Sequence, residues 1–436
     1  MYQPKMKLTK EQQEILEGKQ GETKAKIIET LVRYGDIFDA SELVPVTHGT
    51  GHLVTSFGLG VIKPVYRIFD EIIASNLTVK DGFTADPRPL DYKNVKANLL
   101  EKFVFNKFMY GKQKDYEEQL LKVGLKSKDS FTCACYFDEL GNLPKKGDIL
   151  SWAESSAVNY ANSVLGARCN RNSGMIDIFG SILGLAPKFG LLTDEGRKAT
   201  WVVRLNLTKM PEPQILGSAI GLKVMEEVPY VIGLDKWIGN ELNQNAKDFL
   251  KDFGAATASN GAVGLYHIDN LTPEAKELGQ KLIKEGAKEY IIDDAELERV
   301  YKSYPVMWKK MEKNGNLAFI GCPHLSMKQL NEWSDKILNT LKSNGRKKVS
   351  CRTILCTPPP IRYEFEKTEK YKALTAAGVK VTSICPLMYT NNPLTKSRRI
   401  MTCSNKLRTY SIARYYKSDD LLDIITHKKG YKKEGK

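Results

Sequence analysis

Two Cys-Pro pairs follow short apolar runs in the C-terminal half of the chain. Cys322 follows LAFIG (317–321) and Cys385 follows VKVTSI (379–384). In an open parallel sheet, ligands bind beyond the carboxyl ends of the strands, where the loops converge. Proline at the next position ends the strand, because it cannot donate a ladder hydrogen bond. The placement therefore suggests that both cysteines are metal or cluster ligands.

Two thiols do not complete such a site, and the segment SFTCACYFDELGNLP offers a third in Cys133 or Cys135. In a β-like C-x-C segment one side chain usually packs inward while the other is exposed. Zinc sites normally show paired C-x-x-C or H-x-x-x-H spacings, and here only His48 and His52 are so spaced. No carboxylate stands between them, as a zinc-protease helix requires. An enzyme that uses zinc or a thiol nucleophile is a weaker alternative, to be judged by metal analysis.

The residues after Cys322 predict the start of a helix. Ser326 and Gln329 fit a capping box, so the helix dipole would favour a thiolate close to this end. Cys356 and His267 also close apolar runs that resemble strands.

A second group of candidate residues lies in DILSWAESSAVNYANSVLGARCNRNSG (148–174). The segment is expected to begin as a helix with a stripe of small side chains, formed by Ala153, Ala157 and Ala161. Beyond Gly166, two arginines and an asparagine supply planar donors suited to carboxylate or phosphate. The alternative is a packed helix whose arginines cap the last carbonyls, and the residues alone leave both possibilities open.

The chain has 436 residues, of which 42% are hydrophobic, and a formal charge of +15. This length predicts about three α/β-sized lobes. No run of about 18 uncharged apolar residues occurs, and the N-terminal stretch lacks the apolar core of a signal peptide. We therefore expect a cytoplasmic protein that does not enter membranes and keeps its eight cysteines reduced. The spread of lysines is weak evidence for RNA binding and modest evidence for an anionic ligand.

Strand-like and helix-like segments alternate after an N-terminal helical segment (1–40) in which Thr9 is the expected N-cap, and 273–286 is one of the expected helices. This order predicts parallel sheets covered by helices. Turn-forming residues at 209–214 and 343–348 suggest where the lobes join. The expected lobes are therefore 41–210, 211–345 and 346–417, followed by a basic tail, 418–436.

These motifs together resemble the aconitase X family. The blocks that carry the resemblance run in order along nearly the whole chain: LVPVTHGTG, FTADPRPLD, TCACY, GNLPKKGD, WAESSAVNYANSVLGARCNR, GAVGLYHIDNLTPEA, GCPHLS, VTSICPL and TCSNK.

The resemblance implies an α/β fold, with an aconitase-like catalytic core of several parallel-sheet lobes around an iron–sulfur cluster and without a swivelling domain. It implies that Cys133, Cys322 and Cys385 hold the cluster, with [4Fe–4S] expected before [3Fe–4S] or [2Fe–2S]. Three thiolates leave one iron of a cubane free to act as a Lewis acid on a departing hydroxyl. The implied activity is that of a hydro-lyase on a small hydroxylated anion, with mevalonate 5-phosphate and cis-3-hydroxy-L-proline as candidate substrates.

The resemblance also implies roles for other residues. Expected catalytic residues are His48, Ser155, Ser404 and Lys406. Expected substrate-binding residues are Thr50, Gly51, Glu154, Asn162, Arg168, Asn170 and Arg171. A structural role is the alternative for each of them; Ser155, for example, can satisfy a helix carbonyl. His324 either supports the cluster from behind Cys322 or is a polar residue at the rim of the site.

Several positions depart from the family pattern. Ala134-Cys135 replaces Thr-Pro after the first ligand, and Ser383-Ile384 replaces Asp-Thr before the third. GARTNR has become GARCNR, Cys403 replaces an asparagine, and FTADPRPLD differs from the usual Asn-Pro loop. These changes keep all three ligands but alter their surroundings, so a different hydroxy acid or reduced activity is the expected consequence.

In two-chain members of the family, a separate small subunit carries the swivelling domain and is expected to supply a catalytic serine. No segment here matches that domain, so we expect this chain to be a large subunit with such a partner. The alternative function is a non-catalytic aconitase-fold protein that binds RNA through its basic surface. RNA retention that weakens steeply with salt would distinguish this alternative.

Overall fold

The N-terminal helical segment contains two helices. In the computed structural model, which describes residues 2–54, 57–308, 315–391, 394 and 398–427, Thr9 caps α1 (Lys10–Leu16) as expected, through a capping box with Gln12. Glycine-containing residues 17–21 interrupt the predicted helix before α2 (Glu22–Ile37), which buries its apolar stripe against α7 (Gly174–Leu183).

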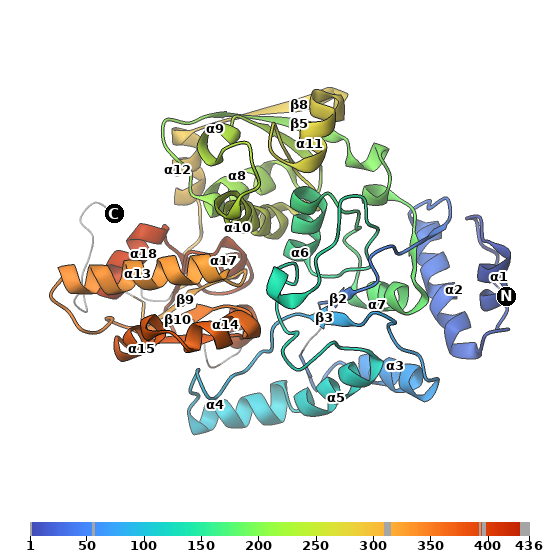
Figure 1. Ribbon diagram of the computed structural model, residues 1–436, viewed down its shortest axis with the longest axis horizontal. Coiled ribbons are helices and arrows are strands. Elements are labelled where there is room, and N and C mark those ends of the chain that lie inside the picture. The colour runs from blue at the N-terminus through green and yellow to red at the C-terminus, as the bar shows by residue number, and fades with distance from the viewer. Residues whose placement is uncertain (1, 55–56, 309–314, 392–393, 395–397, 428–436) are drawn as a thin grey trace.

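The first lobe holds two small sheets. β1 (Leu43–Pro45) pairs antiparallel with β4 (Leu185–Pro187), and β2 (Gly51–Leu53) pairs parallel with β3 (Phe83–Ala85). Its remaining helices are α3 (Lys63–Ala74), α4 (Leu99–Val104), the π-helix η1 (Phe105–Met109), α5 (Gln113–Val123), α6 (Ser155–Tyr160) and the π-helix η3 (Ala161–Leu165). Single helical turns lie at Asp138–Leu140, Gly190–Leu192 and Glu195–Arg197. Figure 1 shows α3, α4 and α5 in one row along the edge of this lobe.

The helix expected from residue 148 begins later. α6 starts at Ser155, and its N-cap Glu154 has φ +134°. Ala157 and Ala161 lie within α6 and η3, whereas Ala153 precedes the helix. The side chains of α6 pack on α10 (Gln244–Gly261) of the second lobe.

The second lobe is a four-stranded parallel sheet in the order β7-β6-β5-β8. Its strands are β5 (Ala199–Asn206), β6 (Pro229–Ile232), β7 (His267–Ile268) and β8 (Ile283–Asp293). Its other helices are α8 (Pro213–Val224), α9 (Asp235–Ile238), α11 (Pro273–Leu278), the 3-10 turn η6 (Gly279–Leu282) and α12 (Asp294–Lys302). The helix expected over 273–286 therefore ends at Leu278, and the residues after η6 join the sheet.

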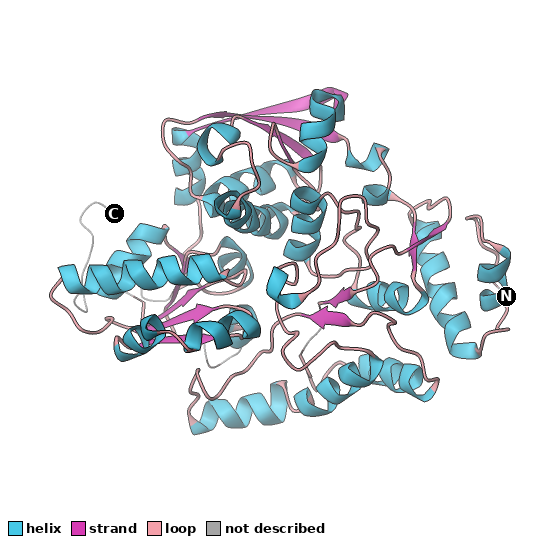
Figure 2. Ribbon diagram, in the orientation of Figure 1, coloured by secondary structure: helices cyan, strands magenta, loops and turns pink. Residues whose placement is uncertain are grey.

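The third lobe is a five-stranded parallel sheet in the order β11-β10-β9-β12-β13 (Figure 2). Its strands are β9 (Leu317–Ile320), β10 (Arg352–Cys356), β11 (Val379–Thr382), β12 (Ile400–Thr402) and β13 (Arg414–Tyr415). Its helices are α13 (Met327–Ser343), α14 (Pro359–Glu366), α15 (Glu369–Ala376), α16 (Pro386–Thr390), α17 (Asn405–Tyr410) and α18 (Ser418–Thr426). Both faces of this sheet are buried, because alternate residues of β9 enter two different apolar clusters.

Strand pairing places the lobe joints earlier than the sequence suggested. β5 is an inner strand of the second sheet, although it precedes the expected boundary at 210. β9 is the middle strand of the third sheet, although it precedes the expected boundary at 345. A central strand must belong to the lobe whose sheet it completes, so the joints lie just before β5 and before β9.

The tail expected from residue 418 begins as an ordered helix. α18 buries Leu421 and Ile425 against the apolar cluster that also contains α13. The rest of the basic cluster, 428–436, lies outside the described residues. Over the described part of the chain, no helix combines the length and apolar character needed to cross a lipid bilayer.

Candidate active site

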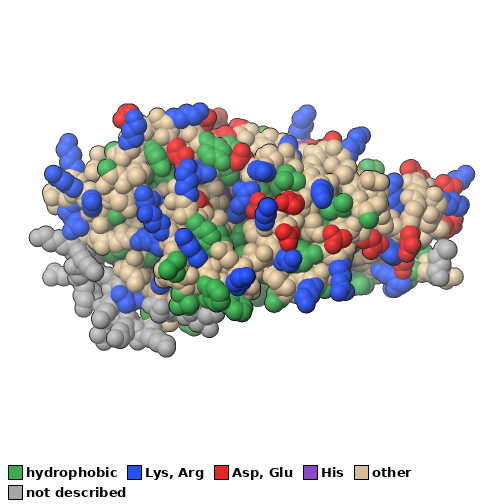
Figure 3. All heavy atoms as spheres, turned by 90° about the horizontal axis from the view of Figure 1, so that it is seen from below, with side chains coloured by type: hydrophobic (Ala, Val, Ile, Leu, Met, Phe, Trp, Pro, Cys, Tyr) green, Lys and Arg blue, Asp and Glu red, His purple; other side chains and the backbone are tan. Residues whose placement is uncertain are grey.

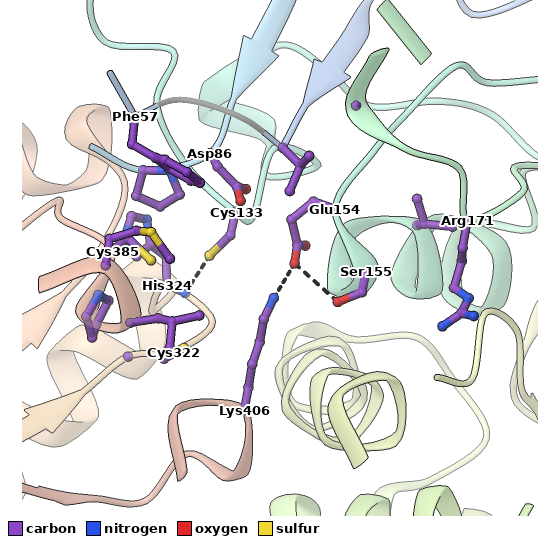
Figure 4. A pocket seen from close by; sticks show the side chains of 18 of the residues that line it. Phe57, Asp86, Cys133, Glu154, Ser155, Arg171, Cys322, His324, Cys385 and Lys406 are labelled. Atoms are coloured by element: carbon purple, nitrogen blue, oxygen red, sulfur yellow. Dashed lines mark hydrogen bonds and ion pairs between the residues drawn. The ribbon is translucent and has the colours of Figure 1, made fainter. Parts of the chain in front are cut away.

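A cavity of about 460 Å³ opens between the first and third lobes (Figure 4). Its volume is typical of a site for a small ligand. Three cysteines, an ion pair, an arginine and the N-terminus of α7 line it. The cavity lies beyond the carboxyl ends of β9 and β11, at the edge of the sheet where the sequence predicted the chemistry.

The three predicted ligand cysteines all line this cavity. Cys133 lies on a first-lobe loop, Cys322 follows β9, and Cys385 is the N-cap residue of α16 after β11. All three are free thiols. Burial raises the pKa of each thiol, that of Cys385 to about 12, and the Cys322 thiol adds to this effect at Cys133 and Cys385. A bound metal reverses this preference, because a coordinating thiol loses its proton.

This donor set fits an iron–sulfur cluster. Its members are three thiols from three separate loops, and thiolates are the usual ligands of such clusters. Among the described residues, no three His, Cys, Asp or Glu side chains are close enough to hold one metal ion. That spacing is compatible with a cluster, since each thiolate would bind a different iron. The two histidines with zinc-like spacing also have different partners: His48 contacts Asn142, and His52 contacts Thr84.

A buried ion pair crosses the cavity between Glu154 and Lys406. Glu154 also accepts from the Ser156 hydroxyl at 2.6 Å and from the Ala157 N–H at 2.7 Å. Burial opposes the charge on Glu154, but the Lys406 ammonium and these donors lower its pKa to about 2. Lys406 also donates to Ser156 at 3.2 Å. Both charges therefore persist at neutral pH inside the cavity.

Arg171 lies on the far side of this ion pair from the thiols (Figure 4). No carboxylate within the described part of the chain forms an ion pair with its guanidinium, and burial lowers its pKa. Beside it, Asn172, Ser173 and Gly174 form the N-terminal end of α7. A free guanidinium beside a helix N-terminus is suited to an anion such as phosphate.

Two predicted hydroxyls lie close to the cavity. Ser155 lines it and donates to the Glu154 carboxylate at 3.5 Å. Ser404 is buried at the N-terminus of α17, where it caps the Leu407 N–H, and a hydrogen bond from Ser404 to Cys322 partly offsets the rise in the pKa of that thiol.

His48, Thr50 and Gly51 do not line the cavity. The Nε2 atom of His48 lies 2.7 Å from Asn142 Oδ1, and the Thr50 hydroxyl donates to the Asp81 carbonyl. Gly51 is the buried first residue of β2.

Asn162, Arg168 and Asn170 have structural partners instead of facing the cavity. Asn162 donates to the Cys169 and Gly264 carbonyls and accepts from Arg197. Arg168 pairs with Asp194, and Asn170 donates to the Phe189 carbonyl. The expectation that these three bind substrate does not agree with this arrangement. Of the predicted arginines, Arg171 alone reaches the cavity wall.

Asp86 also lines the cavity, although it was not among the residues expected there. Burial raises the pKa of its carboxyl to about 6, against the effect of nearby His52. The His52 Nε2 atom lies 3.6 Å from Asp86 Oδ1, and neither of these buried atoms has a hydrogen-bond partner among the described residues. The available signal was the Asp-Pro step within FTADPRPLD, which directly follows β3 in the structure.

The two histidines near strand ends, His267 and His324, lie in different surroundings. His267 is buried and donates to the Arg197 carbonyl, which makes it a core residue of the second lobe. His324 lines the cavity, is fully buried and bonds through both ring nitrogens. Burial lowers the pKa of His324 to about 4.

The chain belongs to the aconitase X family. Models of the first, second and third aconitase X domains match residues 5–195, 199–302 and 315–420. These ranges agree with the joints indicated by strand pairing. The expected aconitase-like α/β core is confirmed, since the crystal structure of Thermococcus kodakaraensis aconitase X in its holo-form matches with a TM-score of 0.79 at 26% identity, over 96% of this chain and 100% of that one.

Among its relatives are the large subunits of phosphomevalonate dehydratase. That of Thermococcus kodakarensis is 31% identical over 343 residues, which is 78% of each chain. That of Methanocaldococcus jannaschii is 28% identical over 414 residues, 93% of this chain and 95% of the relative. The cis-3-hydroxy-L-proline dehydratase of Hypocrea jecorina is 31% identical over 292 residues, 64% of this chain but 46% of that protein. The relatives are thus dehydratases, which are hydro-lyases.

Proposed function

We propose that this chain is the large subunit of a cytoplasmic iron–sulfur dehydratase that removes water from a phosphorylated hydroxy acid. The observation that carries the proposal is the meeting of three thiols, a charged Glu154–Lys406 pair and Arg171 in one cavity. When bound by Cys133, Cys322 and Cys385, a cluster would supply a Lewis-acidic iron for the departing hydroxyl.

The chain's own residues would bind and orient the substrate. Arg171 and the N-terminus of α7 hold the anionic group at one end of the cavity. Lys406 keeps a positive charge in the middle of the cavity, where it stabilises negative charge that develops near the reacting carbons. The hydroxyl of Ser155 lies between these two ends, and its hydrogen bond to the ionised Glu154 carboxylate orients it there.

The two ends of the cavity favour an elongated substrate. Figure 4 shows the thiols and Arg171 on opposite sides of the ion pair. Mevalonate 5-phosphate has a phosphate remote from its hydroxyl-bearing carbon, whereas cis-3-hydroxy-L-proline is compact. We therefore favour mevalonate 5-phosphate as the substrate, and the similarity to phosphomevalonate dehydratase large subunits supports this choice.

A small-subunit partner follows from the same comparison. The relatives that this chain matches over nearly their whole length are themselves named large subunits. We propose that a small subunit with the swivelling domain closes over the cavity. Nothing in the comparisons favours the RNA-binding alternative, and Lys and Arg are scattered over the face in Figure 3 without forming a single stripe.

The test is anaerobic co-expression with the adjacent small-subunit gene, followed by iron analysis and assays of water loss from both candidate substrates. We expect the complex to dehydrate mevalonate 5-phosphate and Cys322→Ser to lose its bound iron and activity. Cys351→Ser is the matched control, because Cys351 is half-buried outside the cavity. Full iron content in Cys322→Ser, or no turnover of either compound, would contradict the proposal.

A further inference from the structure

His324 is a polar side chain without exposure to solvent, and its hydrogen-bonding atoms are all satisfied. Its ring Nδ1 lies 3.0 Å from the Thr132 hydroxyl, and its Nε2 lies 3.2 Å from the Ile384 carbonyl. Its backbone N–H donates to Cys133 Sγ at 3.5 Å, and its carbonyl accepts from Lys251 Nζ at 2.8 Å.

Each ring contact reaches a residue next to a proposed ligand. Thr132 directly precedes Cys133, and Ile384 directly precedes Cys385. His324 itself stands two residues after Cys322. One imidazole therefore joins the three loops that carry the thiols, loops that are far apart in the sequence.

The partners fix the direction of these hydrogen bonds. A carbonyl can only accept, so Nε2 must carry a proton and donate it to Ile384. The Thr132 hydroxyl accepts from the Ala134 N–H at 3.0 Å, which leaves its own proton free to be donated to Nδ1. The result is one continuous chain of hydrogen bonds from the Cys133 loop through the ring to the Cys385 loop.

His324 also contacts all three lobes. Thr132 belongs to the first lobe, Ile384 to the third, and Lys251 lies in α10 of the second. The Lys251 side chain is itself buried, so its bond to the His324 carbonyl supports the backbone of the Cys322 loop from behind.

A cluster requires its thiolates at one fixed spacing, whereas loops by themselves are the least constrained parts of a fold. We propose that His324 is a positioning residue that holds Cys133, Cys322 and Cys385 at the spacing an iron–sulfur cluster needs. This inference rests on the proposed function, since it assumes that the three thiols bind iron. It assigns no catalytic role to the imidazole.

The contacts of His324 with the three cysteine loops are called the clamp below. Three substitutions separate the effects of its two ring hydrogen bonds. His324→Gln keeps a donor near the position of Nε2 and can bond to Ile384, while it loses the acceptor for Thr132. His324→Asn keeps an acceptor near Nδ1 and loses the donor for Ile384. His324→Ala loses both, and all three keep the backbone N–H that bonds to Cys133. His267→Gln is the matched control, because it alters another buried histidine that lies outside the cavity.

The measurements are iron bound per chain after anaerobic reconstitution, the rate of iron release to a chelator, and the EPR spectrum of the reduced protein. We expect iron release to be at least tenfold faster in His324→Ala, with an altered spectrum, because partners that orient ligands are typically worth about 10–100-fold in metal affinity. His324→Gln and His324→Asn should fall between Ala and wild type. His267→Gln should lower the melting temperature but leave the spectrum and release rate unchanged.

Wild-type iron content, release rate and spectrum in His324→Ala would overturn the clamp while leaving the proposed function intact. If His324→Ala is not recovered folded, wild-type behaviour of both His324→Gln and His324→Asn would overturn it equally. Failure of the wild-type protein itself to bind iron would overturn the proposed function, and the clamp with it.

Discussion

At the scale of single residues, the Glu154–Lys406 pair is the most constrained feature of the cavity. Glu154 has φ +134°, a region that residues with a side chain rarely adopt. Its carboxylate is held by an ammonium, a hydroxyl and a backbone N–H. Strained backbone of this kind persists where the surroundings over-determine it, and it clusters at functional sites.

Removal of one partner of this pair should destabilise the protein strongly. We expect Lys406→Met to lower the free energy of unfolding by about 3–5 kcal/mol, because the Glu154 carboxylate would stay buried without its counter-charge. The double variant Glu154→Gln/Lys406→Met should regain part of that loss. Urea unfolding of the two single variants and the double variant measures the coupling. Additive losses in the double variant would show that the two charges do not interact.

Because of His267, we expect the free energy of unfolding to depend on pH. Burial lowers its pKa from 6.5 to about 4, so the unfolded chain binds the proton first as the pH falls. The free energy of unfolding should therefore be fully retained above pH 6.5 and decrease towards pH 4, by up to about 3 kcal/mol.

His267→Gln should remove the contribution of His267 to this dependence, while that of His324 remains, since glutamine can donate to the Arg197 carbonyl without titrating. Urea unfolding at several values between pH 7 and pH 4.5 would compare the two proteins. Parallel pH profiles for wild type and variant would contradict this assignment.

Some of the residues that line the cavity could be found from the sequence at this scale. Cys322 and Cys385 could be proposed from strand ends alone, because the carboxyl edge of a parallel sheet is set by local patterns. Cys133 needed the family resemblance. Asn162 and Arg168 have polar side chains of the right kind but face other partners, and only the packing of Arg197 and Asp194 around them decides this.

At the scale of elements, capping residues were the most reliable signals. Thr9 and Ser326 both form capping boxes where the sequence placed them, because the motif depends only on the N-cap residue and the residue three positions later. β7 is shorter than its apolar run suggested, and β8 begins inside a predicted helix. Pairing with β6 determines the first and pairing with β5 the second, and a strand distant in the sequence leaves no local signal.

The turn between β9 and Cys322 depends on Gly321. It has φ +100°, and a Cβ placed there would lie 2.3 Å from the Cys356 carbonyl oxygen. Gly345, at the other end of α13, has φ +61° with no atom within 4 Å of such a Cβ. Both positions need a left-handed backbone, but only Gly321 also needs the space.

Gly321→Ala should therefore cost far more stability than Gly345→Ala, whose cost we expect to be about 1–2 kcal/mol from backbone conformation alone. Because the displaced backbone leads directly into Cys322, Gly321→Ala should also lose iron after reconstitution, whereas Gly345→Ala should retain it. Thermal unfolding and iron analysis of both variants test this. Equal effects at the two positions would show that the close approach to Cys356 is not limiting.

At the scale of the whole molecule, the cavity lies between the first and third lobes, which share no sheet. Cys133 and Glu154 come from the first lobe, whereas Cys322, Cys385 and Lys406 come from the third. Lobe number could be predicted from the chain length, and sheet type from the alternation of elements. The joints could not, because a proline-containing stretch marks a turn without revealing which sheet the preceding strand enters.

Removal of iron should loosen the contact between lobes. A group bound to thiols from two lobes stabilises their docked arrangement, in proportion to its affinity for the folded state. We expect the melting temperature of reconstituted protein to fall by several degrees after chelation under reducing conditions. Cys322→Ser should show no such change, whereas Cys351→Ser should behave as wild type. An unchanged melting temperature in wild type would mean that the lobes dock without the metal.

The proposed cluster ligands lie far apart along the chain, and their positions set an order for biosynthesis. Cys385 is translated roughly 250 residues after Cys133, a delay of about 10–50 s at ordinary rates of elongation. During that interval the Cys133 thiol has neither its partner thiols nor the third lobe that covers it. If these three thiols hold a cluster, its insertion must therefore follow synthesis of nearly the whole chain.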